Sequence, residues 1–238
     1  MSYDQGGRWT AQATTPQVGI DVGLRDYMLR VYNYMAGGLA ITGLVAYVAA
    51  ASGFYQAIFG TALYWVVIFA PLALVLLLSF RIQKMSLGAA QLTYWAYAGL
   101  VGLSLSGLFI VYTGASIAQT FFITAATFLA MSLYGYTTRS DLTRFGSFLF
   151  MGLIGIVIAG LVNLFLRSPG LQFAISVIGV VVFVGLTAWD TQRIKEMYWE
   201  GDDTVVAGKK AIMGALRLYL DFVNLFLILM QFMGQRRN

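Results

Sequence analysis

The sequence predicts an all-α, polytopic membrane protein, a bundle of seven transmembrane helices. Composition, the spacing of the charges and the placement of Lys and Arg lead to this fold class. Hydrophobic residues make up 59% of the 238 residues and charged residues only 11%, against roughly 25% in a soluble domain. Because a water-soluble fold of this size could not bury so much apolar surface, lipid must be its outer solvent.

The chain begins with a polar segment, residues 1–25, that is rich in Gly, Thr and Gln. No apolar run with a small-residue cleavage site follows the start, so we expect a disordered cytoplasmic tail and no signal peptide. The remainder, residues 26–238, is expected to form one domain of seven transmembrane helices.

Stretches of the sequence without charged residues predict where the membrane spans lie, because one span needs about 20 apolar residues. Fifty uncharged residues lie between Arg30 and Arg81, and 54 lie between Lys84 and Arg139, so each interval holds two spans. Three further apolar runs follow. The expected spans are 32–52, 58–80, 91–112, 118–136, 145–166, 171–191 and 212–233.

The distribution of Lys and Arg predicts the orientation. With the N-terminus inside, the inner segments carry 11 of these residues, and the outer loops between spans carry only Arg167. We therefore expect a multi-pass protein of a bacterial inner membrane with a cytoplasmic N-terminus. The pair Arg236-Arg237 conflicts with this pattern, because seven full spans would leave it outside. A last segment that re-enters and returns to the inner side remains an alternative.

Two residue types are missing altogether. Without Cys the chain has no disulfide, no thiolate nucleophile and no Cys-ligated metal centre. Without His it lacks the usual general base, the commonest transition-metal ligand and the ordinary near-neutral pH switch. We therefore expect neither an enzyme nor a resident cofactor. The net charge of +5 follows from the inner excess of Lys and Arg, so nucleic acid is not an expected partner.

Two acidic residues lie within apolar spans, where a charge costs about 2.5–3.5 kcal/mol on insertion scales. Asp190 lies at the inner end of the sixth span, and Asp221 lies in the seventh. If the seventh span enters lipid near Leu216, Asp221 is about 8 Å deep at 1.5 Å per residue. The two spans are antiparallel neighbours joined by a short charged loop, so the two carboxyl groups can meet.

Two close carboxyl groups in a low-dielectric site cannot easily both ionise, and they share a proton. Asp190 and Asp221 would thus form a pH sensor without histidine. Deprotonated, they would offer hard oxygen ligands to Ca²⁺, with Asn224 as a supporting polar group one turn along. Because Ca²⁺ takes 6–8 oxygens, we expect weak and transient occupancy, with Ca²⁺ as a permeant ion.

Basic residues near the two acids allow a simpler interpretation. Arg217 lies four residues before Asp221 and Arg193 three after Asp190, so each acid could form a salt bridge within its own helix. Arg81, at the inner end of the second span, is a third candidate partner. It would act as a latch that protonation releases, or simply as a positive-inside anchor.

Three motifs carry a resemblance to a known family. Residues 187–192 (TAWDTQ), 215–226 (ALRLYLDFVNLF) and 135–149, which begin GYTTRSDL, resemble the Bax inhibitor-1 family, also called the transmembrane Bax inhibitor motif family. The resemblance runs from about residue 25 to the end of the chain.

The resemblance implies a seven-helix bundle whose last helix is central and enclosed by the other six. It also implies a pH-sensitive calcium leak in which Asp190 and Asp221 are the sensing pair. A second role implied by the family is modulation of membrane partners, including quality-control proteases and, in animals, cell-death proteins.

Three functions therefore remain open. The leading hypothesis is a pH-sensitive, Ca²⁺-permeable leak. The alternative is a non-conducting interaction protein that modulates a membrane-bound quality-control protease. An intramembrane aspartyl protease is a remote third, because Leu218-Tyr219-Leu220 precedes Asp221 where that class has Gly-x-Gly. Expected partners are membrane lipids, Ca²⁺ and, in the alternative, such a protease.

Overall fold

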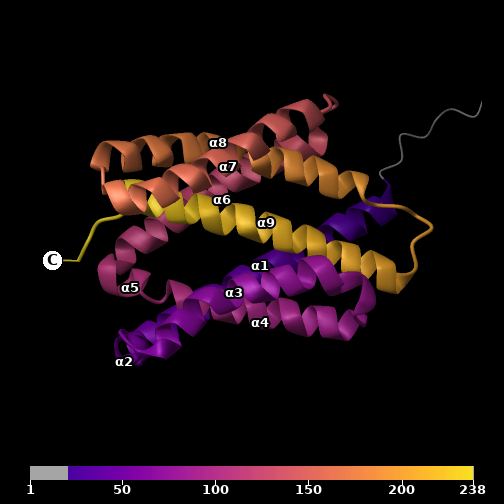
Figure 1. Ribbon diagram of the computed structural model, residues 1–238. Coiled ribbons are helices and arrows are strands. Elements are labelled where there is room, and N and C mark those ends of the chain that lie inside the picture. Colours follow the sequence, from indigo (N-terminus) through magenta and orange to yellow (C-terminus); the bar gives the residue numbers. More distant parts are fainter. Residues whose placement is uncertain (1–20, 238) are drawn as a thin grey trace, which may run out of the picture.

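The computed structural model describes residues 21–237, and the described chain is almost entirely helical, with no strand (Figure 1). Seven helices are long and apolar enough to cross a membrane, which confirms the predicted fold class. The helices are α1 (Val22–Ala51), α2 (Phe54–Ile58), α3 (Ala62–Arg81), α4 (Leu87–Leu105), α5 (Leu108–Val111), α6 (Gly114–Thr137), α7 (Thr143–Leu166), α8 (Pro169–Glu196) and α9 (Thr204–Met233), with a 3-10 turn η1 (Ile82–Lys84) after α3.

The first and last long helices begin well before the apolar spans expected for them. The Asp21 carboxylate accepts a hydrogen bond from the Leu24 amide at 2.9 Å, and Asp203 accepts one from Val206 at 2.7 Å. These N-caps start each helix in the polar region that precedes its apolar stretch. The expected tail boundary at residue 25 thus falls inside the first turn of α1, and the expected disorder of residues 1–20 lies outside the described residues.

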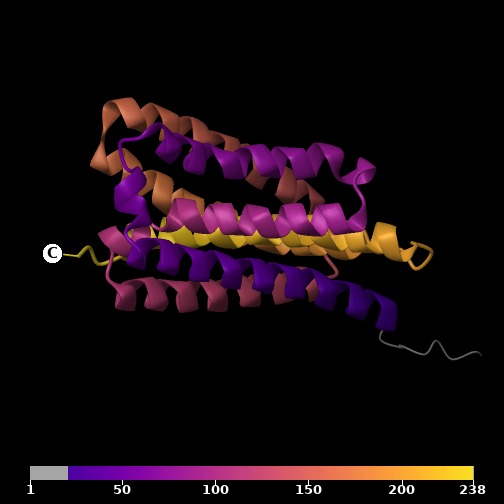
Figure 2. The same ribbon diagram turned by 90° about the horizontal axis from the view of Figure 1, so that it is seen from below.

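Helix α9 occupies the centre of the bundle (Figures 1 and 2). It packs against α1, α4, α6 and α8, and 61% of its most apolar stretch is buried, the largest share among the seven spanning helices. The expected enclosure by all six other helices is corrected by the structure. Helix α3 packs mainly on α4, and α7 packs mainly on α8, so both stand beside the central group.

One glycine permits the close approach of α6 to α8. A methyl group added at Gly135 would overlap the carbonyl oxygen of Ala188, which lies two residues before Asp190. Small residues at such crossings let helix backbones pack closely in membranes. The contact therefore fixes the part of α8 that carries the first acidic residue.

The C-terminal segment is fastened to the turn between α5 and α6. The Thr113 amide donates to the Gln235 carbonyl oxygen at 3.0 Å, and the Arg237 amide donates to that of Val111 at 2.9 Å. The Gln235 amide also donates to Ser116 Oγ at 2.8 Å. Because α9 is one continuous helix ending at the opposite end from the start of α1 (Figure 1), it is a full span, not a re-entrant segment.

We predict that positions 141 and 236 lie on opposite sides of the membrane. The Cys-free chain allows single-cysteine variants to be labelled with an impermeant maleimide. Asp141→Cys should react from the cytoplasmic side and Arg236→Cys from the outer side. Labelling of residue 141 from outside would reverse the orientation, and labelling of both from one side would contradict a full span for α9.

We also predict that Gly135→Ala weakens the bundle. The added methyl group forces α6 and α8 apart, and overpacking of this kind typically costs about 1–3 kcal/mol. Gly155→Ala in α7 is the matched control, because a methyl group there meets nothing within 4 Å. Thermal unfolding in detergent should show a lower midpoint for the first variant only, and equal midpoints would show that α6 and α8 adjust without cost.

Candidate functional site

The two acidic residues of the predicted site come from adjacent antiparallel helices. Asp190 lies in the last two turns of α8, and Asp221 lies in the middle of α9. Both are buried, with 9% and 6% of their surface exposed. The helices pack along their length and are joined by the short segment 197–203, which holds the two residues at the same level of the bundle.

The carboxyl groups of Asp190 and Asp221 are neighbours at the α8–α9 interface, because both line one cavity and each acts on the charge of the other. Asp221 Oδ2 is buried and has no hydrogen-bond partner among the described residues. An ionised carboxylate only accepts hydrogen bonds, so a bond between the two groups requires that one of them carry a proton. The pair can therefore hold one proton between them or lose it.

Arg217 supplies the positive charge nearest to this pair. Its Nη1 donates to Asp190 Oδ1 at 3.5 Å, and its side chain is 37% exposed. The expected salt bridges within single helices are both corrected here. Arg217 of α9 pairs across the interface with Asp190 of α8, not with Asp221, and the Arg193 guanidinium lies over the Trp189 ring at 5.3 Å.

The structure does not bring Arg81 to the site. It is exposed at the last residue of α3, and it forms no salt bridge with any described residue. The turn after α3 does contact α9, where Lys209 Nζ donates to the Gln83 carbonyl oxygen at 3.2 Å, but Lys209 lies about three helical turns before Asp221. The predicted latch contact is therefore absent from the described chain, and Arg217 is the cation that pairs with the dyad.

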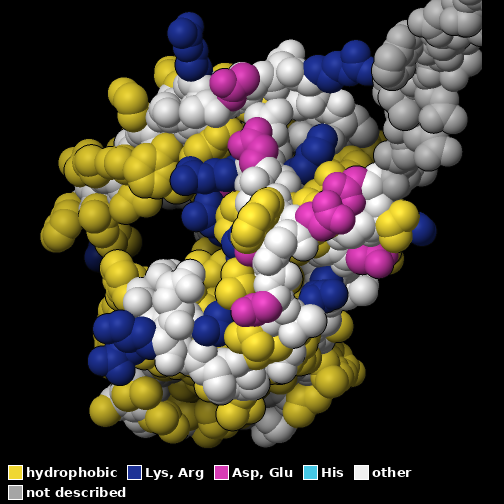
Figure 3. Space-filling model, turned by 90° about the vertical axis from the view of Figure 1, so that its right-hand side faces the viewer, with side chains coloured by type: hydrophobic (Ala, Val, Ile, Leu, Met, Phe, Trp, Pro, Cys, Tyr) yellow, Lys and Arg dark blue, Asp and Glu magenta, His cyan; other side chains and the backbone are white. Residues whose placement is uncertain are grey.

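A cavity of about 350 Å³ adjoins the two carboxyl groups. Residues of α7, α8 and α9 line it, and its polar members include Asn224, whose side-chain amide donates to the Leu220 carbonyl oxygen at 2.9 Å. Figure 3 looks at the end of the bundle that carries the α8–α9 connection and shows a deep hollow with Lys and Arg side chains nearby. The lining residues are Phe150, Leu153, Phe183, Leu186, Trp189, Asp190, Arg193, Arg217, Leu220, Asp221 and Asn224.

The same three helices carry a second polar cluster at their other end. The Asn163 amide of α7 donates to Gln172 Oε1 of α8 at 3.0 Å, and Gln172 Nε2 donates to Gln231 Oε1 of α9 at 2.8 Å. Sequence reasoning missed Gln172 and Gln231, because an isolated Gln near the end of a span gives no signal of its own. Polar groups thus lie at both ends of the α7–α8–α9 group.

Gln192 is a third residue whose role the sequence did not reveal. Its Oε1 accepts from the Leu142 amide at 2.9 Å, and its Nε2 donates to the Ser140 carbonyl oxygen at 2.8 Å. Within this loop, hydrogen bonds from Thr143 hold the pKa of Asp141 below its usual range. Gln192 therefore ties the α6–α7 connection to α8, two residues after Asp190.

Comparison with known proteins identifies the relatives of this chain. The sequence matches the family described as "Inhibitor of apoptosis-promoting Bax1" over residues 24–238. A protein of Rickettsia prowazekii is 52% identical over 230 residues, covering 96% of this chain and 98% of the relative. The inner membrane protein YbhL of Escherichia coli is 52% identical over 219 residues, covering 90% and 94%.

The chain belongs to the Bax inhibitor-1 family. The resemblance seen in the three motifs is thereby confirmed over nearly the whole chain. A membrane protein of Streptococcus pyogenes, 34% identical over 220 residues, covers 90% of this chain and 95% of the relative. Together with the seven apolar helices, these relatives identify an integral, multi-pass membrane protein.

The chemistry open to this Bax inhibitor-1 family site is set by two carboxyl groups and one arginine. Among residues 21–237, no group of three or more Asp, Glu, His or Cys side chains is placed to hold a metal ion. The site can exchange one proton, and its deprotonated oxygens can contact a passing cation. Both properties follow from the residue types and their burial.

We predict that Gln192→Leu loosens the α6–α7 connection. The variant removes both hydrogen bonds to the loop while keeping a similar side-chain volume. Amide exchange at residues 138–142, followed by mass spectrometry, should become about tenfold faster, equivalent to about 1.4 kcal/mol. Gln83→Leu is the control, because Gln83 is exposed and its side chain bonds to no described residue. Unchanged exchange in Gln192→Leu would mean that other contacts hold the loop.

Proposed function

We propose that this Bax inhibitor-1 family protein is a pH-sensitive leak for Ca²⁺, gated by Asp190 and Asp221. It would act in a bacterial inner membrane with its N-terminus in the cytoplasm. One observation carries the proposal: two buried carboxyl groups from adjacent helices line one cavity inside a bundle of membrane-spanning helices. In a chain without His, a pair of buried carboxyl groups at a helix interface is one of the few arrangements that can couple proton binding to helix packing.

The charge of the site explains why proton loss favours Ca²⁺. With one proton on the pair, the single negative charge is balanced by Arg217, which contacts Asp190. Without that proton, the two carboxylates and Arg217 carry a net charge of −1 in a site largely removed from water, and Arg193, at the edge of the cavity, lies over Trp189 and forms no salt bridge with either acid. An uncompensated buried charge is costly, so the carboxyl groups separate or take up a cation. The affinity for Ca²⁺ is therefore expected to rise with pH.

Polar side chains along α9 suggest the path of the ion. Arg217, Asp221 and Asn224 line the inner cavity, and Gln231 lies two helical turns beyond Asn224 in the outer amide cluster. Between them, Ile228 packs directly against Gly179 of α8. This apolar contact would keep the path closed until α8 and α9 separate, as hydrophobic constrictions do in channels.

We predict that Asp221→Asn and Asp190→Asn each flatten the pH dependence of Ca²⁺ flux. Asn keeps the size and hydrogen bonding of Asp but cannot titrate, and a titrating group changes its protonation ratio about tenfold per pH unit. The measurement is Ca²⁺ entry into liposomes that contain the purified protein, across pH. Over the pH range in which the Ca²⁺ flux of the wild type changes with the titration of the pair, the flux of each variant should change less than about twofold.

Asp202→Asn provides the matched control. Asp202 forms a salt bridge with Lys210 in the connection to α9, away from the dyad, so its loss should leave the pH profile unchanged. If both dyad variants keep the wild-type profile, the carboxyl pair is structural. The alternative, a non-conducting protein that modulates a membrane-bound quality-control protease, then becomes the better proposal.

A further inference from the structure

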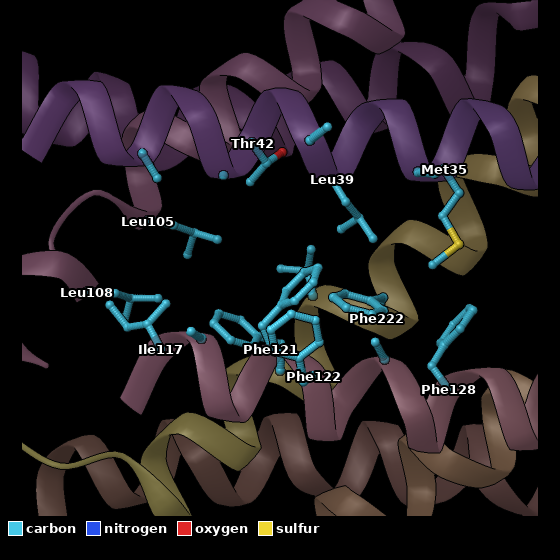
Figure 4. A pocket seen from close by; sticks show the side chains of 18 of the residues that line it. Met35, Leu39, Thr42, Leu105, Leu108, Ile117, Phe121, Phe122, Phe128 and Phe222 are labelled. Carbon is cyan, nitrogen blue, oxygen red and sulfur yellow. The ribbon is translucent and has the colours of Figure 1, made fainter. Parts of the chain in front are cut away.

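A long apolar groove lies on the side of α9 formed by α1 and α6. Its larger part is a cavity of about 730 Å³ into which side chains of α1 and α6 point (Figure 4). A second cavity of about 320 Å³ continues toward the inner end, and both are lined by Tyr32 and Leu129. Helices α1 and α6 do not pack extensively against each other, so the groove separates them along much of their length.

The groove is suited to an apolar occupant. Phe222, Val223 and Phe226 of α9 line its floor. Its few polar atoms already have partners: the Thr42 hydroxyl bonds to Tyr219 OH and donates to the Ala98 carbonyl oxygen. Tyr32 OH shares a hydrogen bond of 2.6 Å with Ser132 Oγ. A polar ligand would find no free group in this part of the groove.

The exposure of the groove to lipid favours an acyl chain as its occupant. From Tyr32 to Ala46, α1 rises about 21 Å, so the larger cavity runs along the direction of the acyl chains of the surrounding bilayer. Phe122 and Leu129, which line it, are exposed on the surface of the bundle and leave the groove open to lipid.

Positive charge marks the inner mouth of the groove. Arg25 of α1 lines the smaller cavity and forms no salt bridge with any described residue. Across the mouth, Lys195 Nζ lies over the ring of Tyr136, another lining residue, at 5.1 Å. From Arg25 to Ala36 α1 rises about 16 Å, close to the roughly 15 Å depth of one leaflet's hydrocarbon.

We propose that this groove binds one phospholipid of the inner leaflet. Its phosphate lies at Arg25, and an acyl chain runs past Tyr32 into the larger cavity as far as Ala36. Charge complementarity favours an anionic headgroup. The lipid lies against the face of α9 opposite to the cavity beside Asp221, so its site is distinct from the carboxyl pair.

The test places a bulky side chain in the path of the acyl chain. Ala36→Phe fills the groove, whereas Ala130→Phe puts the same side chain on the lipid-exposed side of α6, outside both cavities. The proteins are reconstituted in vesicles of phosphatidylglycerol and phosphatidylcholine and extracted into detergent. Native mass spectrometry then counts the phospholipids that each retains. Wild type and Ala130→Phe should retain one, and Ala36→Phe should lose it.

Arg25→Gln tests the headgroup without disturbing the apolar part of the groove. The wild type should retain phosphatidylglycerol in preference to phosphatidylcholine, and the variant should retain the two in the ratio of the vesicle. Equal retention in Ala36→Phe and wild type overturns the proposal. A wild-type protein that retains no lipid, or that emerges as a dimer whose second copy covers α1 and α6, overturns it as well.

Discussion

The burial of the Asp190 and Asp221 carboxyl groups at one helix interface constrains the helices around it, because an acidic group inside a membrane must be shielded from lipid. Helix α8 brings one acid to the interface through its close approach to α6 at Gly135. Helix α9 brings the other from the most buried span of the bundle. Arg217 then supplies the opposite charge from α9 to α8. The central position of α9 and the tight α6–α8 crossing both hold the two acids at their interface and shield them from lipid.

Sequence reasoning located the acids but not their partners, for a physical reason. Asp190 and Asp221 stand out because charge is rare in an apolar span, and the antiparallel order of two neighbouring spans brings them together. Which cation joins them depends on how each helix is rotated. Arg217 faces α8, whereas the inner end of Arg81's helix meets α9 near Lys209, about three helical turns before Asp221. The hydrogen-bonded amides of Gln172 and Gln231 were missed because an isolated Gln near the end of a span gives no signal of its own.

Helix ends were also harder to predict than helix number. Charge-free intervals of 50 and 54 residues fix how many spans fit, because the membrane sets their length. They do not say where a helix continues into polar sequence. The caps at Asp21 and Asp203 add whole turns before the apolar stretches of α1 and α9. The Arg236-Arg237 pair, which conflicted with the charge rule, ends a full span.

The fastening of the C-terminal segment determines how α9 can move. Sliding along its axis would break the bonds from Thr113 and Arg237, whereas pivoting about its outer end would leave them intact. Asp221 lies 14 residues, or about 21 Å, from Gln235. A tilt of about 5° about that point would displace Asp221 sideways by about 2 Å. In the proposed gating, α9 would therefore act as a lever, and a small angular change at its fastened outer end would become a change in the separation of the two carboxyl groups.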